Sequence, residues 1–165
     1  MLQAAEIDSP LGPILVVADD EALYLLEFVA RGSVKEEVDL FRKKTKLPII
    51  AGKADAAKQV EKELTSYFSG KLQEFKTPLL PMGTPFQKRV WEELQKIPMG
   101  QTRSYADIAK AIGKPSAFRA VALANSKNAI AIVIPCHRVI NSNGNMGGYA
   151  GGIEKKEWLL KHESR

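Results

Sequence analysis

A proline-rich segment near the middle of the chain limits what this sequence can fold into. Residues 76–85 contain three prolines and one glycine, which interrupt helices and strands. A chain of 165 residues is long enough for one ordinary domain or for two small ones. The sequence therefore predicts an N-terminal α/β scaffold domain over 1–80 and a second domain over 81–165.

The N-terminal region has the pattern of a small α+β domain. Strand-like apolar runs cover residues 13–18 and 22–29, and the acidic residues 19–21 between them are typical of a hairpin turn. Apolar residues at helical spacing predict two amphipathic helices, one with Val34, Val38 and Phe41 and one with Val60, Leu64, Tyr67 and Phe68. We expect a small antiparallel sheet with helices and no catalytic cluster.

The C-terminal region is predicted to be mostly helical. Residues 84–87 combine a capping Thr, a Pro at the first helical position and a Gln three residues after the cap. Residues 104–107 repeat the capping pattern and predict a short helix to about Ile112. A turn at residues 113–114 separates it from a second helix predicted over 115–126. The two helices form a candidate helix-turn-helix.

The only cysteine of the chain follows an apolar run. Residues 129–134 predict a buried strand that leads to Pro135, Cys136 and His137. A glycine-rich loop and a last helix, from Ile153 to about Glu163, come after it. A thiol becomes a strong nucleophile when a neighbouring imidazole or cation favours its thiolate. Adjacent strand residues face opposite ways, so the two side chains cooperate only if the chain turns, as Pro135 allows.

Charge is distributed unevenly along the chain. Residues 1–82 hold 11 basic and 13 acidic residues, a net charge of −2, whereas residues 83–165 hold 13 basic and 6 acidic residues, a net charge of +7. Such a basic half suits a polyanionic partner such as nucleic acid, and it equally suits a solvated basic surface.

Several classes of protein are excluded by composition. No apolar run approaches the roughly 20 residues that span a bilayer, and Glu6 stands where a secretory signal would be apolar. A single cysteine excludes an intramolecular disulfide and leaves Cys136, His137 and His162 as the only soft metal ligands. We expect a cytoplasmic protein with no membrane association, no metal site and no cofactor.

Beyond these patterns, the sequence resembles the O6-alkylguanine-DNA alkyltransferases, also called methylated-DNA–protein-cysteine S-methyltransferases. The similarity centres on Pro-Cys-His-Arg-Val at residues 135–139 and extends over 84–163, whereas the N-terminal half is similar in layout only. The further matching segments are Phe86–Trp91, Ile97–Thr102, Ser104–Tyr105, Arg119–Val121, Asn128, Gly148–Gly152 and Glu157–Leu160.

The resemblance implies direct reversal of DNA damage in a single turnover. The partner would be double-stranded DNA with an alkylated guanine, and O4-alkylthymine is a further candidate substrate. A helix-turn-helix bound in the minor groove would flip the nucleotide out, and a monomer without a cofactor would transfer the alkyl group irreversibly to Cys136.

The resemblance also implies roles for individual residues. The catalytic set is Cys136 as acceptor, His137 as its base through a water, Glu163 as the residue orienting His137, Tyr105 as proton donor to the departing guanine, and Asn128 as the residue that ties down the turn. The DNA-binding set is Arg119, which fills the vacated space in the duplex, with Ser104, Tyr105, Ala117, Ala120 and Arg138. The substrate pocket is Pro135, Val139, Tyr149, Ala150, Gly151 and Gly152.

Two other interpretations stay open at this point. One is a non-catalytic protein that binds alkylation damage in DNA. The other is a cysteine hydrolase that uses Cys136, His162 and Asn128, although hydrolases usually have a base remote in sequence. The sequence also departs from the family at Phe118, where a smaller residue is usual, so Phe118 either packs inward or alters the contact with the groove.

Overall fold

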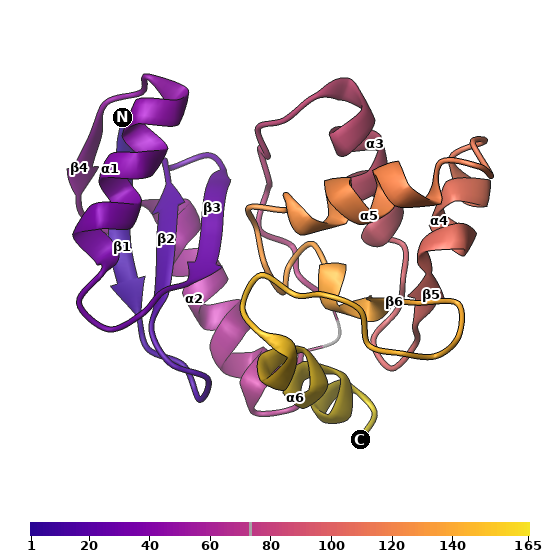
Figure 1. Cartoon of the computed structure of the whole chain (residues 1–165). Coiled ribbons are helices and arrows are strands. Elements are labelled where there is room, and N and C mark those ends of the chain that lie inside the picture. The colour runs from indigo at the N-terminus through magenta and orange to yellow at the C-terminus, as the bar shows by residue number, and fades with distance from the viewer. Residues whose placement is uncertain (73) are drawn as a thin grey trace. The chain divides into compact units, whose positions relative to one another are not determined.

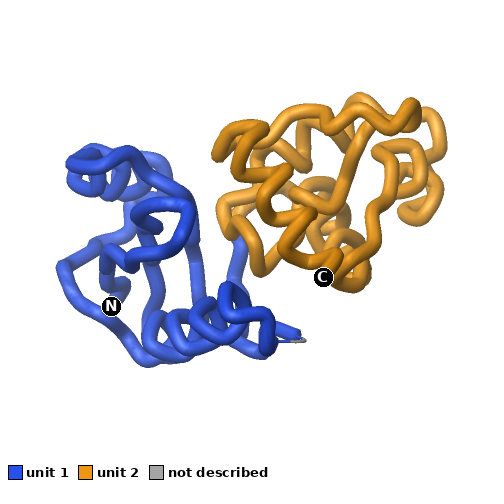
Figure 2. Tube along the Cα trace, turned by 90° about the horizontal axis from the view of Figure 1, so that it is seen from below, with its two compact units in different colours: residues 1–81 blue, residues 82–165 orange. Residues whose placement is uncertain are grey.

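The computed structural model describes residues 1–72 and 74–165, which form two compact units (Figures 1 and 2). Unit 1 comprises Met1–Pro81 and unit 2 comprises Met82–Arg165. Each unit has buried apolar residues of its own. Among the described residues, no helix has the length and apolar character needed to cross a membrane.

Unit 1 is built on a four-stranded sheet with the strand order β3-β2-β1-β4. The strands are β1 (Leu2–Ile7), β2 (Ile14–Ala18), β3 (Leu23–Phe28) and β4 (Ile49–Ala51). The three long strands pair antiparallel, whereas β4 pairs parallel with β1, so the sheet is mixed. The predicted hairpin between β2 and β3 is confirmed, because the Asp19 carboxylate accepts hydrogen bonds from the backbone N–H groups of Glu21 and Ala22, both at 2.8 Å.

The two helices predicted in unit 1 are also confirmed as α1 (Val34–Thr45) and α2 (Asp55–Phe68). The inward face of α2 contains Ala57, Val60 and Leu64, each at most 2% exposed. These residues recur at the three- and four-residue spacing that places side chains on one helix face. Burial of this stripe stabilises unit 1 mainly by removing apolar surface from water.

Unit 2 is mostly helical. Its helices are α3 (Pro85–Leu94), α4 (Tyr105–Ala111), α5 (Phe118–Ser126) and α6 (Ile153–Glu163), and its other elements are the short strands β5 (Arg103–Ser104) and β6 (Val139–Ile140) and the 3₁₀ turn η1 (Cys136–Arg138). Both predicted capping boxes are confirmed, at Thr84 with Gln87 and at Ser104 with Asp107. The α+β fold class is therefore confirmed.

Helices α4 and α5 form the helix-turn-helix, and α3 supports them from inside. Trp91 of α3 is 1% exposed, and its indole N–H donates to the carbonyl of Ala124 in α5 at 2.9 Å. Helix α5 begins at Phe118, three residues later than predicted, because the backbone N–H of Ala117 bonds to Lys114 in a turn.

The buried strand predicted over residues 129–134 is wrong. The segment is buried, but it forms turns in which Ile132 has φ +69° and the N–H of Ile134 bonds to the carbonyl of Ile130. Asn128 causes this. Its side-chain amide donates to the carbonyls of Ile130 and Ile134 at 3.2 and 2.8 Å, and its oxygen accepts from the N–H of Ile130 at 3.0 Å. The Asn side chain thus replaces a neighbouring strand as hydrogen-bond partner.

Candidate active site

The turn organised by Asn128 delivers the chain to Cys136, the first residue of η1. Pro135 precedes it, with φ −81° and ψ 63°, and the N–H of Arg138 closes the turn on the Pro135 carbonyl at 3.0 Å. The chain therefore bends where the sequence required it to bend. Asn125, one turn back in α5, donates to the carbonyl of Cys136 at 3.3 Å, so the helix-turn-helix contacts the backbone of the cysteine directly.

The side chain of Cys136 is a protonated thiol in the resting protein. The residue is 7% exposed. Burial raises the pKa of the thiol, and a hydrogen bond from Asn128 and the charge of Lys156 offset this only in part. A buried thiolate without a compensating charge would be costly. Reaction at this sulfur therefore needs a base that removes the proton when the substrate arrives.

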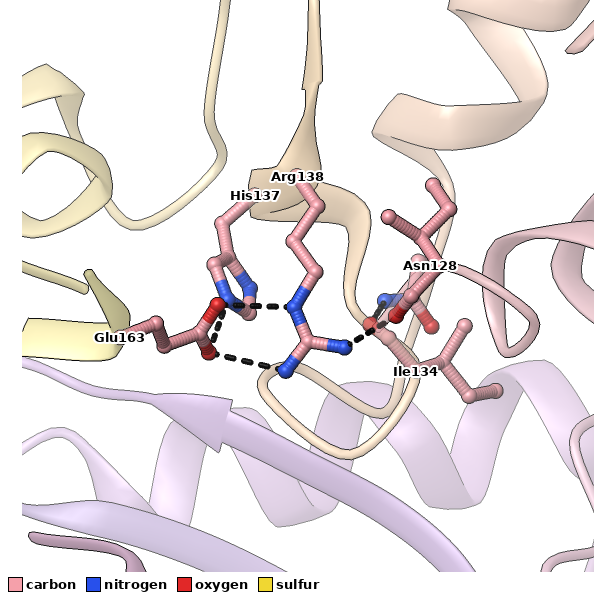
Figure 3. A network of polar contacts seen from close by, with 6 residues as sticks. Asn128, Ile134, His137, Arg138 and Glu163 are labelled. Atoms are coloured by element: carbon pink, nitrogen blue, oxygen red, sulfur yellow. Dashed lines mark hydrogen bonds and ion pairs between the residues drawn. The ribbon is translucent and has the colours of Figure 1, made fainter. Parts of the chain in front are cut away.

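His137 has the position of an oriented neutral base. Its Nε2 lies 2.7 Å from a carboxylate oxygen of Glu163, and both side chains are at most 1% exposed (Figure 3). The Nδ1 atom is buried and has no hydrogen-bond partner among residues 1–72 and 74–165. Burial lowers the pKa of the imidazole more than Glu163 raises it. The N–H at Nε2 thus faces the carboxylate, and Nδ1 is the site at which a proton can be accepted.

Glu163 is a buried anion although it lies near the end of the sequence. Burial raises the pKa of the carboxyl, but hydrogen bonds and charges from His137 and Arg138 outweigh this and lower it to about 2. The group is therefore ionised at neutral pH. A fixed charge behind the imidazole stabilises the imidazolium that forms when His137 takes a proton.

The expectation that Arg138 contacts DNA is corrected by the structure. The residue is 6% exposed. Its guanidinium donates to both oxygens of Glu163, at 2.7 and 2.9 Å (Figure 3). It also donates to the carbonyl of Ile97 at 2.6 Å. A bidentate pair of this kind positions a carboxylate closely. Arg138 therefore holds Glu163 and cannot also reach a phosphate.

Lys156 is a buried residue that the sequence analysis missed. It belongs to α6 and is fully buried, and its ammonium donates to the carbonyls of Val139 at 2.7 Å, Gly148 at 3.1 Å and Met146. Burial lowers its pKa to about 8. Positions 156, 159, 160 and 163 follow the i, i+3, i+4, i+7 pattern of one helix face. A second charge beside Glu163 on an otherwise apolar stripe was the signal that could have revealed Lys156.

Replacement of Lys156 by Met should slow alkyl transfer about 10- to 100-fold. The loop that contains Met146 and Gly148 would lose its anchor, and its displacement would misplace groups around the reacting sulfur. Methionine keeps an unbranched chain one atom shorter than that of lysine and loses all three hydrogen bonds. The measurement is the single-turnover rate on alkylated duplex. Lys161→Met, on the exposed side of the same helix, is the matched control. Equal rates for the two variants would show that the loop needs no such anchor.

Two tyrosines lie close to Cys136. Burial and the negative charge of an ionised Cys136 raise the pKa of Tyr105 and raise that of Tyr149 well above its ordinary value. Both phenols therefore stay protonated. Gly147 has φ +71°, and a Cβ there would lie 2.9 Å from the Tyr105 hydroxyl, so only glycine fits between this loop and Tyr105. The Tyr149 hydroxyl is buried without a partner among the described residues.

The other expected pocket residues divide by exposure. Pro135 and Val139 are buried beside Cys136 in the chain, and Gly151 is half-buried, whereas Ala150 and Gly152 are exposed. The expected DNA-binding residues other than Arg138 lie on α4 and α5 or at their N-caps. Arg119 and Ala120 are exposed on α5, Ala117 is its half-buried N-cap, and Ser104 caps α4 by accepting the N–H of Asp107 at 3.0 Å.

The hydrolase interpretation requires His162 as its base, and the structure gives that side chain another contact. His162 stacks on the ring of Trp158, with centroids 4.8 Å apart, and the buried imidazole next to Cys136 in the chain is that of His137. No cluster of three or more potential metal ligands occurs among the residues that the structure describes.

As the pH is lowered from neutral to 6.5, the rate of transfer should not decline, and it should fall only in more acid solution. The lowered pKa keeps His137 neutral below 6.5, its ordinary value, and the base is lost only when the folded protein takes up the proton. The stability of the fold should also decrease as the solution becomes more acid. The unfolded chain is protonated below 6.5 while folded His137 resists protonation, so the free energy of unfolding decreases there. Single-turnover rates across this range test the expectation, and a decline centred above 6.5 would contradict it.

Comparison with known proteins identifies the family. A family model described as "6-O-methylguanine DNA methyltransferase, ribonuclease-like domain" matches residues 4–81, and one described as "6-O-methylguanine DNA methyltransferase, DNA binding domain" matches residues 85–165. The chain belongs to this family.

Curated relatives and solved structures agree with this assignment. A methylated-DNA–protein-cysteine methyltransferase of Methanosarcina barkeri is 48% identical over 95% of this chain and 94% of its own length. The relative of that name from Mycobacterium leprae is 42% identical over 99% and 93%. The crystal structure of Mycobacterium tuberculosis OGT in complex with DNA is 39% identical, has a TM-score of 0.83 and covers 99% of this chain and 92% of its own.

Proposed function

We propose that this protein repairs alkylated DNA by moving the alkyl group from the O6 atom of guanine to Cys136. The observation that carries the proposal is a buried group of three side chains: the thiol of Cys136, the neutral imidazole of His137 and the ionised carboxylate of Glu163. This group lies next to a helix-turn-helix. The family of the chain and the resemblance of its fold to a DNA-bound relative support the same function.

The chemistry needs two proton movements and one displacement. Nδ1 of His137 accepts the thiol proton of Cys136 through a water, and the sulfur then attacks the alkyl carbon. The C–S bond forms as the C–O6 bond breaks, and the electron pair of that bond leaves with guanine. The phenol of Tyr105, kept protonated by its raised pKa, donates to the guanine anion. The product is a thioether on the protein and an intact guanine in DNA.

The bound guanine must leave the base stack before the buried sulfur can reach it. The exposed Arg119 on α5 is the residue that fills the space left in the duplex. Ser104, Ala117 and Ala120 lie at or near the start of α4 and α5, where the backbone can approach a phosphate or a groove closely. Tyr149 and Gly151 line the pocket on the side of the glycine-rich loop.

The residues assigned to the reaction and to DNA binding all belong to one of the two units. Every site residue named above belongs to residues 82–165, so the proposal needs only one copy of the chain and gives residues 1–81 a supporting role. A thioether is not readily cleaved, and the described residues hold no second thiol that could remove the group. A thiol that has to stay reduced also suits the cytoplasm.

Stoichiometry tests the proposal. An excess of duplex carrying labelled O6-methylguanine is mixed with the protein, and protein-bound label is followed with time. We expect the label to stop at one equivalent per chain. Continued release of labelled product would indicate a turning-over hydrolase, and binding without any protein-bound label would indicate a damage-binding protein.

A further inference from the structure

The outward face of α5 carries more than Arg119. Val121, Ala124 and Asn125 are buried on the inward face of this helix. On the other side, Arg119 and Leu123 are exposed and four residues apart, which places them on one stripe of the helix surface.

Two large apolar side chains near Arg119 are exposed to solvent. Phe118 is 46% exposed and Leu123 is 62% exposed. The guanidinium carbon of Arg119 lies 6.0 Å from the centre of the Phe118 ring, so the ring and the cation are presented together at the start of α5. Single exposed apolar residues are common. Phe118 and Leu123 lie on either side of an exposed arginine on a nine-residue helix, and together they offer apolar surface to a partner.

The charge around this surface selects the kind of partner. Lys110, Lys114 and Lys127 are exposed on or next to α4 and α5. No acidic residue occurs in the sequence from 108 to 127. Exposed apolar side chains beside Arg119, with exposed lysines on or next to the same two helices, match duplex DNA, which offers apolar base faces and sugars between two rows of phosphates.

We infer that Phe118 is a second wedge residue, which packs its ring against the base step beside the flipped nucleotide while Arg119 occupies the vacated space. Leu123 packs against the adjoining sugars. The inference rests on the proposed function and adds a contact that depends on apolar burial and stacking in place of charge. Aromatic stacking of this kind persists in salt, unlike contacts with phosphates.

Removal of the ring should therefore weaken the duplex complex without changing its salt dependence. For Phe118→Ala we expect the duplex concentration at half-maximal transfer rate to rise about 5- to 100-fold. The slope of log affinity against log salt should stay at the wild-type value. Lys127→Ala should do the opposite, with a small loss of affinity and a slope reduced by about one.

The experiment compares two substrates. Single-turnover rates are measured with an O6-methylguanine duplex and with O6-benzylguanine, a free base that needs no wedge. Phe118→Ala should react with the free base at a rate within about twofold of wild type, as should Leu123→Ala. Ile153→Ala, which removes another apolar side chain of unit 2 that is 41% exposed, is the matched control. Phe118→Trp should retain duplex affinity.

A 2-aminopurine placed beside the lesion reports the wedge itself. Its fluorescence rises on unstacking, and this rise should be smaller with Phe118→Ala than with Ile153→Ala at saturating protein. Equal duplex affinity and equal fluorescence for these two variants would overturn the inference. So would self-association of the wild type that Phe118→Ala abolishes, because the surface would then bind a second copy. Failure of the wild-type protein to transfer from any duplex would instead overturn the proposed function.

Discussion

Cys136→Ala is expected to abolish alkyl transfer, with a loss of at least about 10⁴-fold in the single-turnover rate. Cys136 carries the only thiol of the chain, so no other sulfur can lose its proton to His137 and accept the alkyl group. Alanine removes only a sulfur atom from a buried site. The free energy of unfolding should therefore fall by no more than about 2 kcal/mol.

The same variant separates binding from chemistry. The sulfur of Cys136 is buried, and the helix-turn-helix is the part expected to bind DNA. Cys136→Ala should therefore bind an alkylated duplex about as tightly as the wild-type protein binds it. Gel-shift or anisotropy titration measures this, with unmodified duplex as the control. Transfer that survives the substitution would show that another residue accepts the alkyl group.

Glu163→Gln should lower both the transfer rate and the stability. The imidazole of His137 loses the anion that orients it, and we expect a rate loss of about 10²- to 10⁴-fold, the range of a positioned general base. Arg138 is left as a buried cation without a counter-ion, which costs about 3–5 kcal/mol. Thermal unfolding should therefore occur about 10 °C lower.

A double variant separates these two effects. Arg138→Met combined with Glu163→Gln removes both charges, so most of the stability should return while transfer stays slow. Glu157→Gln, on the exposed side of α6, is the control and should match the wild type in both measurements. Recovery of the transfer rate in the double variant would show that Glu163 serves folding only.

Local patterns predicted most of the helices correctly. The capping residues Thr84 and Ser104 carry the signal within four residues of sequence, and the structure forms both capping boxes. Strands β1 and β4 were not predicted. The first has the weak pattern LQAAEI, and the second has three residues and gains its place only by pairing with the first. Such pairing over a long sequence distance leaves little trace in a local pattern.

The errors around the site have a common cause. The apolar run at 129–134 was predicted as a strand because periodicity cannot recognise a side chain, that of Asn128, as a substitute for strand pairing. Arg138 was assigned to DNA from the resemblance to the family, whereas in the structure it is paired with Glu163, 25 residues away. The partners that decide these roles are brought together by tertiary structure, and the sequence order does not reveal them.

Intact-protein mass spectrometry with peptide mapping tests the central claim most directly. The protein is mixed with an equimolar duplex that contains one O6-methylguanine, and the mass is recorded before and after. We expect every chain to gain one methyl group, found on the peptide with Cys136, and the duplex to contain unmodified guanine. An unchanged mass in a folded protein with a free thiol, or a methyl group on any other residue, would contradict it.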